Sequence, residues 1–407
     1  MRPSLTTCLL FGAIGLFPSW SVAQDSETRA DVFRREREAK SSHLTQPKSS
    51  GLERTLLDLE NGRWMERFLN PPEGLYPRLG NVTAGSGISV GPGFRRPNLM
   101  GGHADFQASA AASFTYYWLT EASLQFPRLA GERVSVDVHS QRYDFPEQEY
   151  FGLGPDSNRE DLVLYGLKNT VFGVSSAYRP IPWLTFGGGV DRLEPRVRSD
   201  SEAGAILSVF DEEQAPGIFG QPTFLKYDAS LELNYQRPRG NPRQGGRYGL
   251  AFQRYEDLEG DRFSFSRAEA SLVQYIPILR DRRVLALRAL ATVTEPDAGA
   301  QVPFYLLPTL GGPDDLRGFR RFRFRDRHAI LLQAEYRWEI FTALDGAIFY
   351  DAGKVASRLE DLNFKDLESD YGIGFRFGTV NGVFLRVEGA FGSAGGKHFI
   401  LRFGDVF

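Results

Sequence analysis

The chain has 407 residues, of which 42% are hydrophobic and 24% charged, and it contains a single cysteine. A mean hydropathy of −0.32, with no apolar run of about 18 residues beyond the first 23, excludes a helical membrane protein. One cysteine excludes a disulfide scaffold, and a formal net charge of −3 leaves no electrostatic footprint for nucleic acid.

The first 23 residues have the features of a secretory signal peptide. Arg2 supplies a positive n-region, residues 9–20 form an apolar h-region, and residues 21–23 (Ser-Val-Ala) form a small-x-small cleavage pattern. The cysteine, Cys8, lies within this segment, so we expect a mature chain without cysteine.

Residues 24–74 are expected to hold a disordered tail followed by a short amphipathic helix. Up to about residue 51 the chain is rich in charged residues and serine and nearly lacks large apolar side chains. Within residues 52–69 apolar side chains recur near a helical period, and Pro71-Pro72 ends the segment. Such a helix either docks on the neighbouring domain or acts as a plug or membrane-surface element.

From about residue 75 to residue 407 the hydrophobic pattern has a period of two, which predicts β-strands. In residues 225–236 every odd position is apolar or aromatic and every even position is polar. In residues 327–340 the even positions include Ile330 and Trp338, whereas the odd positions include Glu335 and Arg337. Strands of about 10 to 14 residues match the length that crosses a bilayer at a tilt.

These strands predict an all-β fold, a 16-stranded antiparallel transmembrane β-barrel in the outer membrane, with residues 75–407 as its domain. The apolar face should meet lipid, because a basic side chain there costs up to roughly 2–4 kcal/mol near the midplane. Connections 146–161, 195–222, 295–326 and 355–369 are long and alternate with short turns, which places all of them outside. The expected strands are 75–83, 87–96, 102–114, 116–127, 133–145, 162–179, 183–194, 223–236, 246–256, 263–277, 283–294, 327–340, 343–354, 370–378, 383–392 and 398–407.

Four motifs in this predicted barrel follow one another in a family-specific order. Residues 316–319 (Leu-Arg-Gly-Phe) and residues 349–353 (Phe-Tyr-Asp-Ala-Gly) lie in the long connection and in the thirteenth strand. Residues 95–99 (Arg-Arg-Pro-Asn-Leu) and 403–407 (Phe-Gly-Asp-Val-Phe) lie at the first turn and at the end. With sixteen strands, this set resembles the BamA/TamA outer-membrane superfamily, also called the bacterial surface antigen family.

The resemblance implies that the long loop folds back into the lumen, where Arg317 meets Asp351, with Glu335 as a second acceptor. Strand parity agrees, because Asp351 must face inward to avoid lipid. The alternative is that Arg317 is a solvated loop arginine. The expected site comprises a loop latch of Arg317, Gly318 and Phe319 and lumen partners Glu335, Phe349, Asp351 and Gly353.

The last strand resembles the C-terminal signal by which barrel proteins are recognised and inserted by the cell's barrel assembly machinery. Its residues are Phe403, Gly404 and Phe407, although Phe407 also suits a simple interface aromatic. This strand must pair with the first to close the barrel, and family members are proposed to open sideways or perturb lipid at that seam. Family members also carry POTRA domains before the barrel; residues 24–74 are too few for one, so we expect a POTRA-less variant.

We find no pattern that predicts an enzyme, a cofactor or a metal site. The five histidines lack metal-ligand spacing, and His328 lies on the face assigned to lipid. Residues 392–398 resemble a P-loop only superficially, since no Ser or Thr follows Lys397. The arginines of residues 320–325 are expected to line the lumen or contact lipopolysaccharide rather than nucleic acid.

The resemblance favours a protein that aids insertion or translocation of proteins or lipids at the outer membrane of a Gram-negative bacterium. Its expected partners are outer-membrane lipids and lipopolysaccharide, with periplasmic partner or client proteins as further candidates. A passive diffusion pore and a structural or surface-interaction barrel are the alternatives.

Overall fold

The computed structural model describes residues 71–83, 85–198, 206–279, 282–341, 343–379, 382–393 and 396–402. The predicted signal peptide and helix lie outside the described residues, as do Phe403, Gly404 and Phe407. Among the helices of the described ranges, none has the length and apolar character to cross a bilayer.

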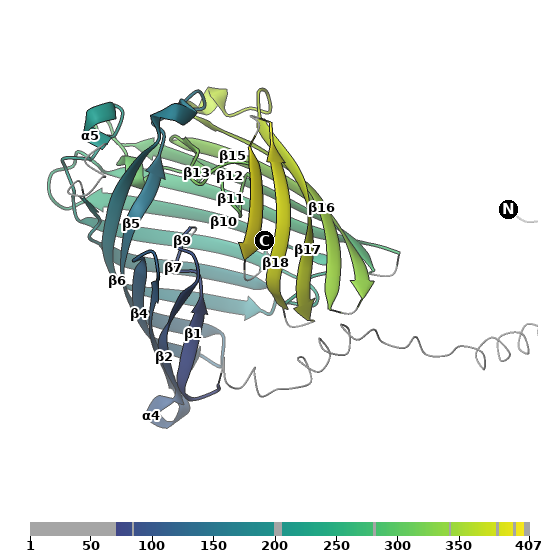
Figure 1. Cartoon of the computed structure of the whole chain (residues 1–407). Coiled ribbons are helices and arrows are strands. Elements are labelled where there is room, and N and C mark those ends of the chain that lie inside the picture. Colours follow the sequence, from purple (N-terminus) through teal and green to yellow (C-terminus); the bar gives the residue numbers. More distant parts are fainter. Residues whose placement is uncertain are drawn as a thin grey trace, which may run out of the picture. The chain divides into compact units, whose positions relative to one another are not determined.

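The described chain is almost entirely antiparallel β-sheet, wound as a meander in which each long strand pairs with the next along the chain (Figure 1). The strands of the sheet are β1 (Gly74–Gly80), β2 (Ser89–Asn98), β3 (Ala104–Ser113), β4 (Trp118–Leu129), β5 (Val134–Tyr150), β6 (Val163–Ile181), β7 (Leu184–Leu193), β8 (Arg196–Arg198), β9 (Phe224–Asn234), β10 (Gly245–Asp257), β11 (Phe265–Ile278), β12 (Arg283–Pro296), β15 (His328–Phe341), β16 (Leu344–Ala356), β17 (Glu368–Thr379), β18 (Gly382–Gly392) and β19 (Lys397–Arg402).

The meander has the predicted sixteen positions. The sheet contains 17 strands, but β7 and the short β8 pair with consecutive stretches of β6 and act as one interrupted strand. The all-β antiparallel prediction is therefore confirmed. Among the described residues no pairing joins β1 to β19, so closure of the barrel at this seam is not observed.

The two ends of the sheet differ. Short turns at one end include α4 (Leu99–Gly102), whereas the other end carries the long connections (Figure 1). These connections contain η1 (Arg159–Asp161), α5 (Ile206–Val209), η3 (Phe304–Leu306), β13 (Thr309–Leu310), β14 (Phe324–Arg325) and η4 (Leu359–Asp361). β5 runs beyond its predicted end, because after a bulge between Phe145 and Gln148 it continues to pair with β6.

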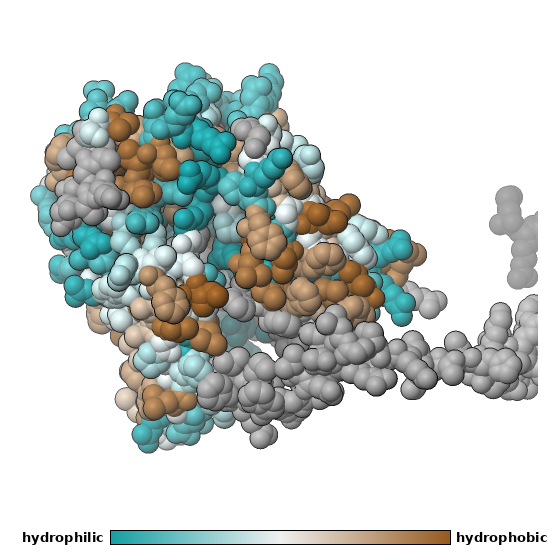
Figure 2. Space-filling model, in the orientation of Figure 1, coloured by the Kyte–Doolittle hydropathy of each residue, from teal (hydrophilic) through white to brown (hydrophobic). Residues whose placement is uncertain are grey.

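Each strand presents two different faces. In β15 the odd positions Leu331, Glu335 and Arg337 are buried, whereas Ile340 on the even face is exposed. Figure 2 shows hydrophobic side chains gathered on the outer surface over the C-terminal strands, as a lipid-facing surface requires. His328 departs from the predicted parity: it is 1% exposed, because β15 begins beneath folded loops instead of beside lipid.

Two apolar clusters fill the long-loop end from inside. The larger, here called the end plug, gathers aromatic and aliphatic residues from strand ends and loops: Tyr150, Val163, Tyr165, Val197, Ile206, Phe210, Ala215, Ile218, Phe224, Tyr255, Phe263, Phe265, Val302, Phe304, Tyr305 and Leu307. The smaller packs the long loop onto β15 and β16: Leu310, Leu316, Phe319, Phe324, Ala329, Leu331 and Val355.

Candidate functional site: a buried ion-pair network under a folded-back loop

The connection between β12 and β15 returns inward as a small hairpin. β13 and β14 pair through Thr309 with Arg325 and Leu310 with Phe324, which leaves residues 311–323 as the tip. Gly311 begins the tip at φ +113°, and a Cβ there would lie 2.3 Å from the Arg320 carbonyl oxygen. Only glycine satisfies both the backbone conformation and the close approach.

The tip places Arg317 in the centre of a carboxylate cluster. Its Nε and Nη2 donate to Asp351 Oδ2 and Oδ1 at 2.7 and 2.8 Å, a bidentate pair. Its Nη1 donates to Glu335 Oε2 and Glu388 Oε1, both at 3.1 Å. The guanidinium carbon lies 3.4 Å from the Phe349 ring centroid, which adds a cation–π contact.

Three more arginines from the strands complete the network. Arg337 Nε donates to Glu335 Oε1 at 2.5 Å, and Arg376 Nη1 donates to Glu388 Oε1 at 2.9 Å while also pairing with Glu335. Arg386 Nε lies 3.4 Å from Glu388 Oε2. Each of these arginines is 1% exposed, so the network is dehydrated. Removing one partner from such a network costs about 3–5 kcal/mol, because it leaves an uncompensated buried charge.

Arg317 keeps its charge in this setting. Burial alone would lower the pKa of its guanidinium, but the carboxylates of Asp351, Glu335 and Glu388 raise that pKa above its ordinary value. The network therefore holds a permanent positive charge supplied by the loop, in addition to the carboxylates and arginines supplied by the wall.

Cross-strand register explains why the wall groups meet. Glu335 of β15 stands opposite Phe349 of β16, and Asp351 stands opposite Asp370 of β17. A Cβ on Gly372 would lie 2.2 Å from the Phe349 ring, so the glycine provides the space in which the ring lies under Arg317.

Glycines also let the loop approach the wall closely. A Cβ on Gly318 would lie 2.5 Å from the Gly392 backbone nitrogen and 2.6 Å from Asp370 Cβ. A Cβ on Gly353 would lie 3.1 Å from Leu310 Cδ1 of the hairpin and 2.7 Å from the Ile330 carbonyl oxygen of β15. Larger residues at either position would push the hairpin away from the strands.

Comparison with known proteins gives the family. The Omp85 superfamily domain model matches residues 98–394, most of the chain. The chain belongs to the Omp85 superfamily. The resemblance to the BamA/TamA superfamily is thus confirmed, and the fold makes this Omp85 barrel an outer-membrane protein.

Solved structures show the same fold at low identity. BamA from Haemophilus ducreyi lacking POTRA domains 1–3 is similar with a TM-score of 0.61 and 15% identity, over 92% of this chain and 81% of that chain. CdiB from Escherichia coli is similar with a TM-score of 0.52 and 13% identity, and the match covers 79% of this chain and 60% of that chain. CdiB from Acinetobacter baumannii is similar with a TM-score of 0.52 and 12% identity, and the match covers 81% of this chain and 58% of that chain. The Omp85 barrel thus spans less than two thirds of either CdiB chain, and no curated protein matches its sequence.

The structure brings most of the expected site together. Arg317 contacts Glu335, Phe349 and Asp351, and Gly318 lies against β17 and β18. Phe319 does not join the ion pairs: it packs in the smaller apolar cluster, with its ring 5.3 Å from that of Phe324. Sequence reasoning on the Omp85 barrel missed four wall residues, although parity alone puts their charges on the inward face: Asp370, Arg376, Arg386 and Glu388.

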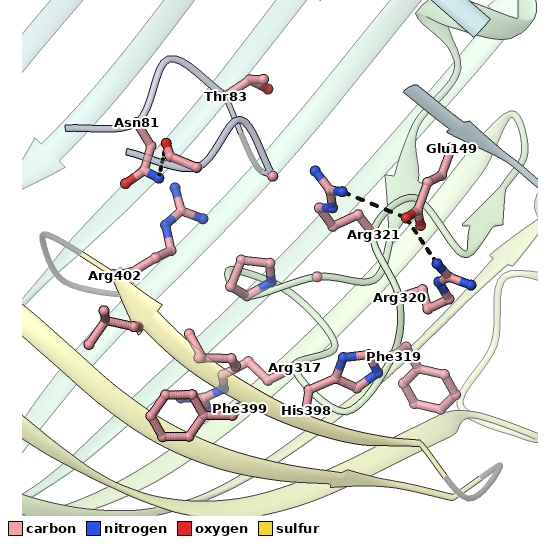
Figure 3. A pocket seen from close by; sticks show the side chains of 16 residues that line it. Asn81, Thr83, Glu149, Arg317, Phe319, Arg320, Arg321, His398, Phe399 and Arg402 are labelled. Atoms are coloured by element: carbon pink, nitrogen blue, oxygen red, sulfur yellow. Dashed lines mark hydrogen bonds and ion pairs between the residues drawn. The ribbon is translucent and has the colours of Figure 1, made fainter. Parts of the chain in front are cut away.

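The arginine run that follows the latch has two environments. Arg325 is 3% exposed and its Nη1 donates to the Phe304 carbonyl at 2.6 Å, and Arg323 Nη1 donates to Ser157 Oγ at 2.7 Å. Arg320 and Arg321 instead line a cavity of the Omp85 barrel (Figure 3). Across the described ranges no group of three or more His, Cys, Asp or Glu is arranged to hold a metal ion.

Proposed function

We propose that this Omp85 barrel aids the insertion or translocation of proteins or lipids at the outer membrane of a Gram-negative bacterium. The observation that carries the proposal is the folded-back loop, which is tied by Arg317 to β15, β16 and β18. A loop clamped inside the wall of the C-terminal strands couples the lumen to the strands next to the seam. That coupling suits a barrel that rearranges around a client better than a rigid conduit.

The end plug also supports assembly over passive diffusion. Tyr150, Phe224, Phe265 and Phe304 are each completely buried in it, and the cluster draws on residues of β5, β6, β9, β10 and β11. A general diffusion pore needs a continuous polar path for water and solutes. An apolar core across the long-loop end opposes such a path.

A pore has one observation in its favour. A cavity of about 470 Å³ adjoins the end plug at Leu193, and its polar lining residues include His139, Asp191 and Lys226. Asp191 accepts a hydrogen bond from Lys226 Nζ at 3.0 Å and lies 3.0 Å from His139 Nε2. Conductance of the purified barrel in a planar bilayer distinguishes the two functions.

The proposed role is non-enzymatic and uses no cofactor, since binding and strand rearrangement are the activity. Outer-membrane lipids and lipopolysaccharide are its proposed surroundings and partners, and periplasmic clients are its proposed cargo. The barrel itself would be inserted by the cell's barrel assembly machinery.

Gene deletion tests this proposal. We expect the deletion to reduce other outer-membrane barrels or to alter lipid asymmetry, as read by proteomics and lipid analysis of the outer membrane. Wild-type protein should restore both, and Arg317→Ala should not. Arg358→Ala, which removes an arginine 64% exposed in a distant loop, should complement like wild type. An unchanged proteome and lipid composition, together with a large stable conductance, would establish the pore instead.

A further inference from the structure

A cavity of about 460 Å³ lies at the seam between the first and last described strands (Figure 3). Its lining comes from four places: the turn between β1 and β2 (Asn81, Thr83, Gly85 and Gly87), Glu149 of β5, the loop tip at 312–321, and β19 at 398–402. Within the described ranges no β1–β19 backbone pairing crosses this region. The lining includes Phe399 and Leu401, which are exposed, as well as Ile400, which is buried, so residues from both faces of β19 border the cavity.

The lining carries more positive than negative charge. Arg320 and Arg321 lie 3.5 and 3.6 Å from one shared carboxylate, Glu149, which is longer than an ordinary hydrogen bond. Figure 3 shows both guanidinium groups directed at Glu149. The side chain of Arg320 is 42% exposed, so it is open to a ligand in the cavity.

A third guanidinium enters from the opposite wall. Arg402 of β19 lines the cavity and pairs with Asp314, a carboxylate that Arg386 also approaches at 3.4 Å. Among the described lining residues, Glu149 is the one acidic side chain facing these guanidiniums. Figure 3 shows Arg402 at one end of the cavity and Arg320 at the other, with Arg321 between them, so the guanidiniums border the space from two sides.

The outer surface beside this cavity is apolar. Leu75 and Leu79 of β1 are 77% and 56% exposed, and Phe399 and Leu401 of β19 are 76% and 54% exposed. These four side chains flank the seam on both sides. A ligand that has an anionic head and hydrocarbon tails would satisfy both surfaces at once.

We propose that the seam cavity binds the phosphate-bearing head group of an anionic amphiphile, with Arg320, Arg321 and Arg402 donating to the oxygens of that head group. The acyl chains lie outside, along the exposed apolar residues of β1 and β19. Both lipid A and an anionic phospholipid present this chemistry. This inference adds a lipid class to the proposed function. It rests on the proposed function only in assuming that the protein lies in the outer membrane, where such lipids occur.

Lipid retention by the purified full chain tests the site. Protein in detergent is incubated with vesicles of phosphatidylethanolamine containing lipid A, dephosphorylated lipid A or phosphatidylglycerol, and bound lipid is counted by native mass spectrometry. We expect the double variant Arg320→Ala/Arg402→Ala to retain at least about tenfold less phosphorylated lipid than wild type, because each substitution removes charge-assisted hydrogen bonds. Arg358→Ala is the matched control and should retain as much as wild type.

The lipid arms identify the source of the phosphate. Loss confined to lipid A assigns the site to lipopolysaccharide, and loss with phosphatidylglycerol as well assigns it to anionic phosphate lipids in general. Equal retention by the double variant, equal retention of dephosphorylated lipid A, or the same loss in Arg358→Ala overturns the proposal. Heat-shifted migration checks folding, and Arg320→Gln replaces the double variant if that fails. Since no client is needed, a negative result here leaves the deletion test of the proposed function independent.

Discussion

A single loop arginine supplies the ion-pair partner of a buried wall carboxylate. Among the described residues, Glu335 and Glu388 also pair with strand arginines, whereas Asp351 pairs with Arg317 alone. Its planar fork fits Asp351 bidentately, a geometry that a lysine ammonium does not reproduce. The identity of this residue therefore matters as much as its charge.

Arg317→Ala should lower the free energy of unfolding by about 3–5 kcal/mol and release the loop without abolishing the barrel. Limited proteolysis of the purified barrel, read for cuts within residues 297–327, measures the release. Arg317→Lys should give an intermediate result, because the charge stays while the fork is lost.

A charge-balancing second substitution separates electrostatics from packing. Arg317→Ala/Asp351→Asn should recover part of the lost stability, since the carboxylate left unpaired by the first change becomes neutral. If the loop of the single variant is as protected from protease as wild type, or if the double variant is no better than the single, the latch account is wrong.

At the scale of elements, the C-terminal strands are shaped by what lies on their inner face. β16 and β17 pair in register along Asp351 with Asp370 and Phe349 with Gly372. The Phe349 ring lies against Gly372, and its centroid is 3.4 Å from the guanidinium carbon of Arg317. The packing of the sheet and the position of the loop therefore both depend on the Phe349 ring.

Gly372→Ala should destabilise the barrel by about 1–3 kcal/mol, because its Cβ meets both the Phe349 ring and the Gly389 carbonyl oxygen at 2.2 Å. Gly389→Ala, one strand away, is the matched control: its Cβ would meet nothing within 4 Å. We expect the free energy of unfolding of this control to lie within about 1 kcal/mol of the wild-type value. The midpoints of urea unfolding in detergent measure this difference. Equal midpoints for the two variants would contradict the steric account.

Periodicity made the strands predictable because each strand meets lipid on one side and the interior on the other. The motif around Arg317 and its carboxylate was predictable from family resemblance. The end plug was not, since Tyr150, Phe210 and Phe304 come from loops and strand ends that lack any period and meet only in the folded chain. His328 was assigned to the lipid face because the alternation of residues along a strand carries no information about a loop that covers the strand end.

At the scale of the whole molecule, the barrel is filled unequally along its length. The end plug is apolar, the network beneath the loop is charged and dry, and the cavity lined by His139 and Lys226 is polar. Exchange of solutes across the barrel should therefore depend on the plug and not on the polar cavity.

Phe304→Ala tests this dependence. Phe304 is completely buried and contacts Tyr150 and Tyr165 with ring centroids 4.9 Å apart in each pair. Its truncation should cost about 3–5 kcal/mol locally and raise single-channel conductance above that of wild type. Lys226→Met, in the polar cavity, should leave the conductance of a plugged barrel unchanged. A wild-type barrel that already conducts as well as Phe304→Ala would refute the plug.

The balance of charge under the loop has a consequence for the order of assembly. Until Arg317 arrives, Asp351 lacks its ion-pair partner among the described residues, and a buried carboxylate without such a partner resists being sealed from water. Insertion of the loop then precedes stable closure, because the C-terminal strands pack stably only after the hairpin has folded inward. A barrel trapped before that step would be a wet, open intermediate, in which Asp351 still faces water.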